Sequence, residues 1–108
     1  MEDKNLFGLP IRVIHRICAI FKKHSSIKKV ILYGSRAMGR EKTGSDIDLC
    51  IDSDDLTLTE LLAIENEIDE LFLPWKIDLS LKQQIDNLDL LQHIQSVGIL
   101  FCQPHQTD

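Results

Sequence analysis

Two short stretches decide the fold of this chain: Tyr33-Gly34-Ser35-Arg36-Ala37-Met38-Gly39 and, a few residues later, Ser45-Asp46-Ile47-Asp48-Leu49. The first contains the end of an apolar, β-branched run over residues 28–33, which predicts a central strand that Gly34 ends. The second opens a segment, residues 45–52, in which apolar and polar side chains alternate as in a half-buried strand. We therefore expect two strands joined by a glycine-containing connection, with a short helical turn after Ser35.

Helical periodicity and capping residues predict the helices and strands on either side of these two strands. Thr57 and Glu60 have the spacing of a capping box, and Asn87 is suited to cap a last helix that ends at Gly98. Alternation returns over residues 75–81 and predicts a third strand. The expected helices lie at residues 9–23, between Thr57 and Pro74, and between Asn87 and Gly98; the expected strands are 28–33, 45–52, 75–81 and a short edge strand at 99–102.

Length and composition limit the class of protein. The 108 residues, 44% of them hydrophobic, predict one domain of α/β (α+β) class, with helices packed on a small mixed sheet. No apolar run approaches the roughly 20 residues that cross a bilayer, and residues 1–5 do not resemble the start of a signal peptide, so we expect a cytoplasmic protein. The net charge of −5 argues against direct nucleic-acid binding.

Three acidic residues are candidates for metal binding. Asp46 and Asp48 are two positions apart in an alternating strand, so both carboxylates project from the same face. Asp78 occupies the polar face of the strand at 75–81, and it joins the other two if the strands are neighbours. Unit charges about 4 Å apart repel by ~4 kcal/mol at an effective dielectric near 20, which a cation would relieve. Hard ions such as Mg²⁺ prefer these oxygen ligands together with substrate phosphates.

The Gly34-Ser35 turn is a candidate phosphate site. A glycine at a strand end allows the backbone to approach a ligand closely. Ser35 can cap the following turn, whose N–H groups would face an anion, and its hydroxyl adds one further donor. A phosphate site beside metal-binding carboxylates is the apparatus of nucleotidyl transfer.

Each of these features also has an ordinary structural explanation. A Gly-Ser pair after a strand is commonly a simple turn, and an Asp-x-Asp on a strand face can be a solvated edge. Three basic residues near the turn can be surface charges, and three acids after the second strand can be a solvated run that starts the next helix. The joint spacing of glycine, serine and aspartates favours the functional interpretation. The basic residues are Arg36, Arg40 and Lys42, and the acids of the run are Asp52, Asp54 and Asp55.

Cysteines and histidines show no pattern of their own. Cys18, Cys50 and Cys102 are odd in number, far apart, and without a partner at metal-ligand spacing, so we expect three buried thiols and no disulfide. The histidines at positions 15, 24, 93 and 105 likewise lack metal-ligand spacing, and we assign none of them a function.

The spacing Gly34-Ser35, ten residues, then Asp46-Ile47-Asp48 resembles the signature of the polymerase β superfamily, in particular its minimal nucleotidyltransferases. The resemblance covers essentially the whole chain. It implies that Asp46 and Asp48 hold two Mg²⁺ ions and that Asp78 completes the catalytic site. It also implies that the Gly-Ser pair contacts the triphosphate of ATP. The arginine at position 36 matches a family arginine, for which we consider nucleotide binding and anchoring of the loop. The methionine at 38 departs from the basic residue common there.

The resemblance also implies a task. Minimal members are commonly encoded beside a small helical HEPN protein, and some act as antitoxins by adding AMP to a tyrosine of that toxin. We therefore expect Mg-dependent transfer of AMP from ATP to a HEPN-type partner, which would supply the acceptor that so short a chain lacks. A second hypothesis is a non-catalytic antitoxin that blocks the partner by occlusion, and a third is transfer to a small molecule or RNA.

Overall fold

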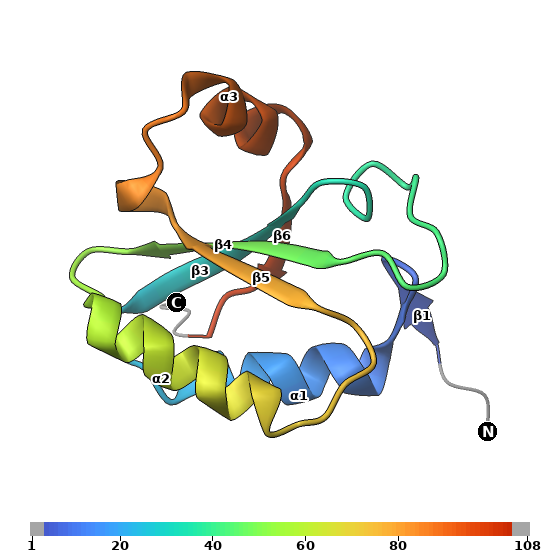
Figure 1. The fold of residues 1–108 in the computed structure, drawn as a ribbon, viewed down its shortest axis with the longest axis horizontal. Helices are drawn as coiled ribbons and strands as arrows, with labels where there is room; N and C mark the ends of the chain where they lie inside the picture. Colours follow the sequence, from blue (N-terminus) through green and yellow to red (C-terminus); the bar gives the residue numbers. More distant parts are fainter. Residues whose placement is uncertain (1–3, 105–108) are drawn as a thin grey trace.

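The computed structural model describes residues 4–104, so His105 lies outside the described residues. Within that range the chain forms a small mixed sheet with three α-helices, as the sequence predicted (Figure 1). The strands are β1 (Asn5–Leu6), β2 (Leu9–Pro10), β3 (Ile27–Tyr33), β4 (Ile47–Ser53), β5 (Ile77–Leu81) and β6 (Ile99–Cys102). The α-helices are α1 (Ile11–Lys22), α2 (Leu58–Asp69) and α3 (Leu88–Val97), with a short 3₁₀ helix, η1, at Lys82–Gln84.

The main sheet has the strand order β5-β4-β3-β6. The pair β4 and β5 is parallel, and the other two pairs are antiparallel, so the sheet is mixed. Helix α2 makes the crossover between the parallel strands, as such a connection requires. The expected strand at 99–102 is present as β6, and it forms one edge of the sheet.

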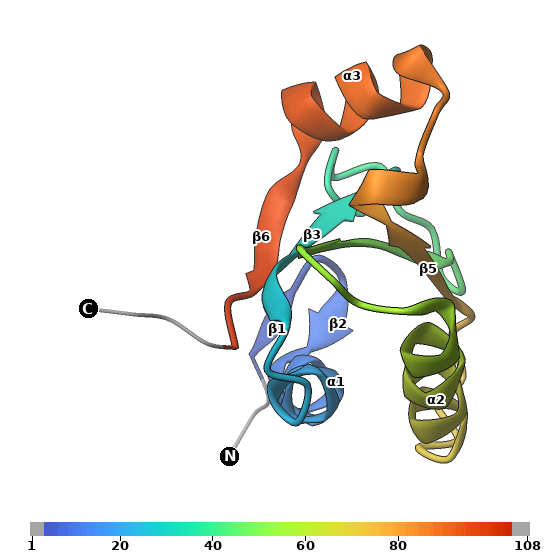
Figure 2. The same cartoon turned by 90° about the vertical axis from the view of Figure 1, so that its left-hand side faces the viewer.

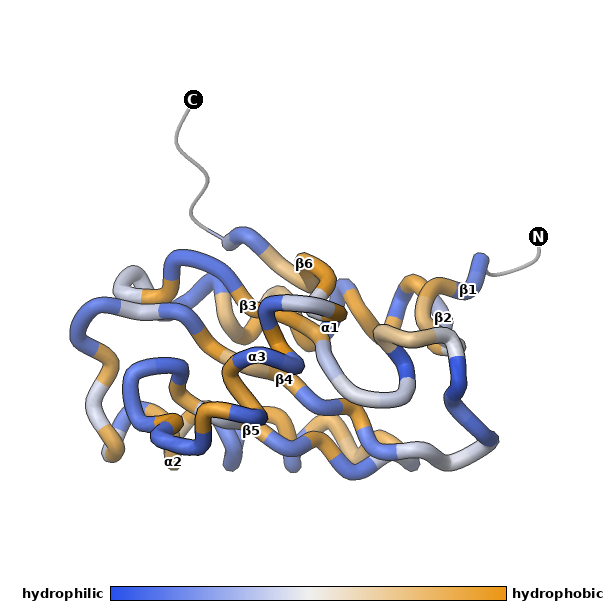
Figure 3. Tube along the Cα trace, turned by 90° about the horizontal axis from the view of Figure 1, so that it is seen from above, coloured by the Kyte–Doolittle hydropathy of each residue, from blue (hydrophilic) through white to orange (hydrophobic). Residues whose placement is uncertain are grey.

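The two faces of the sheet are covered differently. Helices α1 and α2 lie together on one face, and α3 lies on the other, as the two cartoon views show (Figures 1 and 2). The main core lies under α1 and α2, where the apolar residues of the alternating strands β4 and β5 point. In a view from above, hydrophobic segments run mainly along the strands through the middle of the molecule (Figure 3). The polar residues of β4 and β5 therefore point to the α3 side.

The helix caps follow the sequence. The Thr57 hydroxyl accepts a hydrogen bond from the Glu60 N–H at 3.1 Å, and the Asn87 side chain accepts one from the Leu90 N–H at 3.2 Å. Helix α3 ends at Gly98, as expected. None of the helices within residues 4–104 combines the length and apolarity that a bilayer crossing requires.

Two local predictions differ from the structure. The segment before α1 is a hairpin of β1 and β2, whose two turn residues, Phe7 and Gly8, both have positive φ, so the helix begins at Ile11 and not at residue 9. Paired positive φ values are typical of a type I′ hairpin turn. After Ser35 the chain makes hydrogen-bonded turns and no helix, because the pattern does not continue beyond Gly39, whose φ is 70°.

The prediction of three thiols was wrong. Cys18 of α1 and Cys102 of β6 form a disulfide, with their Cα atoms 5.9 Å apart, and only Cys50 is a free, buried thiol. The two partners are separated by 84 positions, so no local spacing signals the pair. They meet because α1 packs beneath the end of β6. The disulfide joins α1 to the edge strand β6.

Candidate active site

Asp48 and Asp78 are brought together by the parallel pairing of β4 and β5. The two residues are direct register partners, and in neighbouring strands such partners project from the same face. Asp48 is half-buried and Asp78 is exposed, on the side of the sheet that α3 covers only in part. The structure thus confirms the neighbouring strands on which the predicted acidic cluster depends.

Asp46 lies just outside this pair. It is exposed and precedes the first residue of β4, Ile47, so the strand is shorter at this end than the sequence pattern predicted. Its charge still reaches Asp48. Burial raises the pKa of the Asp48 carboxyl above its ordinary value, and the negative charges of Asp78 and Asp46 raise it further. The positive charge of Arg36 acts in the opposite direction.

The acids differ in how well they suit Mg²⁺. Among residues 4–104, no group of three or more His, Cys, Asp or Glu side chains forms a metal site by itself. Mg²⁺ usually takes only one or two protein carboxylates and completes its shell with water and substrate phosphates. The paired carboxylates of Asp48 and Asp78, whose mutual repulsion a cation would relieve, fit that requirement.

Gly34 connects the turn to this acid pair. Its φ is 77°, and a Cβ built on it would collide with Oδ2 of Asp48. By contrast, a Cβ on Gly39 or Gly44 would meet nothing within 4 Å, although both also have positive φ. Gly34 is therefore required for space as well as for conformation, because the backbone passes directly beside the carboxylate.

The turn after Gly34 is closed by its own backbone. The Gly34 carbonyl accepts a hydrogen bond from the Met38 N–H at 3.2 Å, and the Ser35 carbonyl accepts one from Arg40 N–H at 2.8 Å. Ser35 itself is half-buried at the start of the turn. Its contact with a nucleotide, like that of Gly34, stays a prediction.

Arg36 is buried and holds the loop together. Only 3% of the residue is exposed, and its guanidinium donates to the carbonyl oxygens of Phe7, Ser45 and Asp46, the first at 2.9 Å. Burial lowers the pKa of this guanidinium, and the charge of Glu41 opposes that effect. Of the two roles considered for Arg36, this geometry supports anchoring. The side chain ties the β1–β2 turn and the start of β4 to the turn after Gly34.

His93 also lies at this site, although no metal-ligand spacing in the sequence indicates a function for it. Its Nε2 accepts a hydrogen bond from the Gly34 N–H at 3.1 Å, and its ring contacts Tyr33 edge to face. Tyr33 in turn reaches across β4 to the next strand, β5, and its hydroxyl lies 3.4 Å from that of Ser80. The available signal was the position of His93 three residues after Leu90, on the face of α3 that packs on the sheet.

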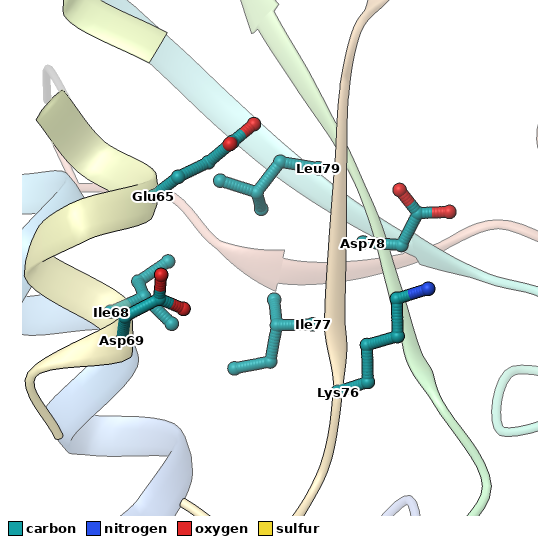
Figure 4. Close-up of a pocket in the computed structure, with 7 residues that line it drawn as sticks. All are labelled: Glu65, Ile68, Asp69, Lys76, Ile77, Asp78 and Leu79. Carbon is teal, nitrogen blue, oxygen red and sulfur yellow. The ribbon is translucent and has the colours of Figure 1, made fainter. Parts of the chain in front are cut away.

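A hollow of about 220 Å³ lies between α2 and the edge strand β5. Its walls include Ile68, Asp69, Ile77 and Leu79 (Figure 4). In the figure the Asp78 carboxylate points away from α2, to the other side of β5. Asp78 also lines this hollow, but its carboxylate is directed away from α2, so we do not assign the hollow to the acid pair.

The strand order and the acid pair beside a glycine turn define a small α/β domain of the nucleotidyltransferase type. Residues 15–107 match the family model described as polymerase β, nucleotidyltransferase, and this chain belongs to that family. Two proteins of Methanocaldococcus jannaschii, each provisionally named a protein adenylyltransferase, are similar to it. One is 36% identical over 63% of this chain and 69% of its own length. The other is 31% identical over 71% of this chain and 86% of its own length.

Solved structures share the fold at low sequence identity. One, a toxin–antitoxin crystal structure with AMP-PNP, has a TM-score of 0.68 at 18% identity, over 82% of this chain and 72% of that one. Another contains a tri-AMPylated Shewanella oneidensis HEPN toxin in complex with an MNT antitoxin. Its TM-score is 0.64 at 15% identity, over 85% of this chain and 71% of that one.

Proposed function

We propose that this chain transfers AMP from Mg-ATP to a tyrosine hydroxyl of a HEPN-type partner and thereby acts as its antitoxin. The observation that carries the proposal is the in-register pair Asp48 and Asp78 beside Gly34, where an added Cβ would meet the Asp48 carboxylate. The names of the archaeal relatives support protein adenylylation. The toxin–antitoxin neighbours, one with AMP-PNP and one with an AMPylated HEPN toxin, support the choice of partner.

Each site residue has a part in this proposal. Asp46, Asp48 and Asp78 would hold two Mg²⁺ ions, and the turn would receive the phosphates at Ser35, beside the close-passing backbone of Gly34. Bound Mg²⁺ supplies positive charge that offsets the negative charge of the triphosphate and of the leaving group. Arg36 keeps the loop in place from behind.

The chemical step is a substitution at the α-phosphate. The acceptor oxygen forms a bond to the α-phosphorus, the bond from that phosphorus to the bridging oxygen breaks, and pyrophosphate leaves. Asp78 accepts the hydroxyl proton. It suits this role because it is exposed at the edge strand β5, where a partner's side chain has access. The half-buried Asp48 beside Gly34 is better placed for the nucleotide.

Position-specific labelling tests the reaction. The chain is co-expressed with a HEPN-type protein, purified, and incubated with Mg²⁺ and ATP labelled at either the α- or the γ-phosphate. Transfer of AMP labels the partner from α-labelled ATP only, whereas phosphoryl transfer would label it from γ-labelled ATP. Asp48→Asn is expected to lower the rate by at least a hundredfold, the order of loss when a main electrostatic contact of the transition state is removed. Equal labelling by wild type and Asp48→Asn would refute the assignment.

Asp52→Asn is the matched control. Asp52 lies on the same strand and the same face as Asp48, four positions along, and its carboxylate is 3.6 Å from the Lys82 ammonium. We expect Asp52→Asn to keep wild-type labelling. The same variants separate catalysis from occlusion, because an occluding antitoxin neutralises its partner with either substitution. Loss of neutralisation in Asp48→Asn alone supports the enzyme.

A further inference from the structure

The contact between His93 and Gly34 joins two elements that are distant in sequence. The two residues are 59 positions apart, one on α3 and the other at the end of β3. The N–H of Gly34 donates to Nε2 of His93 at 3.1 Å, within the normal range for such a bond. A nitrogen that accepts this bond carries no proton, so the imidazole is neutral with its proton on Nδ1.

Helix α3 holds the histidine firmly in this position. The ring of His93 meets that of Tyr33 at 82°, with centroids 6.1 Å apart, and Ile94 is buried against the sheet beside Tyr33 and Cys50. The end of the helix is also fixed. A Cβ on Gly98 would collide with the carbonyl oxygen of Ile94 and with Cγ2 of Ile31, so chain and sheet approach as closely as a glycine allows. The half-buried imidazole is therefore held by its contact with Tyr33 and by a helix whose neighbouring residues pack on the sheet.

This bond has a consequence for the turn. The peptide N–H of Gly34 is already used inside the protein, so a phosphate would have to find its donors further along the turn, beginning at Ser35. Meanwhile the His93 bond fixes the plane of the Tyr33–Gly34 peptide. That plane sets where the turn leaves the sheet and how closely it passes the Asp48 carboxylate.

We infer that His93 is a positioning residue, which fixes the Gly34 peptide so that the turn presents Ser35 to the phosphates beside Asp48. The part of this inference that concerns nucleotide binding rests on the proposed function. The other part, that the imidazole accepts a hydrogen bond from the Gly34 N–H and so fixes that peptide, rests on the observed contact alone. In this arrangement α3 acts on the nucleotide site through the Gly34 peptide.

Two substitutions separate the hydrogen bond from the packing. His93→Phe keeps an aromatic ring against Tyr33 but removes the acceptor. His93→Gln keeps an acceptor at a similar reach but removes the ring. If the bond positions the turn, the KM for ATP rises about tenfold in His93→Phe, equivalent to ~1.4 kcal/mol, with a smaller change in kcat. His93→Gln restores the KM to within about threefold. A purely structural role would lower the melting temperature in both variants without this split.

Two further measurements distinguish a failure of the proposed function from a failure of the role inferred for His93. Equilibrium titration with Mg²⁺ and α,β-methylene ATP, which cannot transfer AMP, reports nucleotide binding without chemistry. Amide hydrogen exchange of Gly34 in the nucleotide-free protein reports the contact itself. Exchange about tenfold faster in His93→Phe than in wild type and His93→Gln supports the inference. Unchanged exchange, or unchanged affinity in His93→Phe, overturns it. Failure of wild type to bind the analogue counts against the proposed function, and the exchange result still decides the role of His93.

Discussion

Asp48 and Asp78 stand opposite each other in register across the parallel strands β4 and β5. Burial disfavours the charged form of Asp48, and the negative charge of Asp78 on the same face adds to this effect. We therefore expect the pair to weaken the metal-free fold at neutral pH. A cation bound beside these carboxylates would reduce their repulsion and so stabilise the folded protein.

Asp48→Asn is expected to raise the melting temperature of the metal-free protein at pH 7 by a few degrees. The substitution removes a half-buried charge that Asp78 and Asp46 oppose. It should also abolish the additional stabilisation by Mg²⁺ and nucleotide that wild type shows. Scanning calorimetry with and without Mg²⁺ and α,β-methylene ATP measures both effects. A marked loss of metal-free stability would instead assign the carboxylate a structural role.

The same pair predicts how stability changes with pH. The folded-state pKa of Asp48 is raised above the unfolded value of about 4. The contribution of this group is therefore fully present below pH ~4 and is lost as the pH rises through the folded-state pKa. Between these values the wild type should lose stability relative to Asp48→Asn as the pH increases. Urea unfolding of both proteins between pH 4 and 7, roughly, gives this difference directly. A constant difference would contradict the raised pKa.

Much of the fold could be predicted because its signals are local. Alternation over residues 45–52 and 75–81 placed β4 and β5, and the cap at Thr57 placed the start of α2. The pairing of two candidate site residues was predictable to the same extent. Asp48 and Asp78 each lie on the polar face of an alternating strand, and pairing of the strands brings them together.

Contacts that depend on tertiary placement could not be predicted in this way. The Cys18–Cys102 disulfide joins positions 84 apart, and the bond from Gly34 to His93 joins positions 59 apart. Both require knowledge of where α1 and α3 pack on the sheet, which no periodicity encodes. The boundary of β4 was also beyond the pattern, since alternation begins at residue 45 whereas pairing begins at Ile47.

Gly34→Ala is expected to destroy nucleotide binding. The added Cβ would collide with Oδ2 of Asp48, and alanine also disfavours the φ of 77°. Gly44→Ala is the matched control, because that residue has a φ of 85° but open space around it. Both variants should lose about 1–2 kcal/mol of stability to backbone strain, and Gly34→Ala should lose more. Only Gly34→Ala should fail to bind Mg²⁺ and α,β-methylene ATP in a titration. Normal binding by Gly34→Ala would remove Gly34 from the site.

The state of the cysteines can be counted by alkylation. Burial raises the pKa of the Cys50 thiol to about 11, and the side chain is almost fully enclosed, so native protein purified without reductant should not react at pH ~8. Unfolding without reductant should expose one reactive thiol, and unfolding with reductant all three cysteines of the chain. Mass spectrometry reads the number of added groups. Three additions without reductant would show that Cys18 and Cys102 are not joined.

Loss of the disulfide should also lower the free energy of unfolding. Cys102→Ser, which cannot form the disulfide, should cost about 2–4 kcal/mol of stability in urea unfolding.

Arg36→Lys is expected to lower stability by about 2–3 kcal/mol, although the charge is kept. A single ammonium cannot replace the fork that donates to Phe7, Ser45 and Asp46, so buried carbonyl oxygens are left without donors. The loop after Gly34 should loosen, and trypsin should then cut it faster at the exposed Arg40. Arg40→Gln is the matched control in the same loop. The Arg40 side chain is exposed to solvent, so its substitution should change stability by less than about 0.5 kcal/mol.

Nucleotide binding separates the two roles of Arg36. Weaker binding by Arg36→Lys, together with faster proteolysis, indicates that the arginine acts by anchoring the loop. Weaker binding with an intact loop would instead assign its guanidinium to the nucleotide.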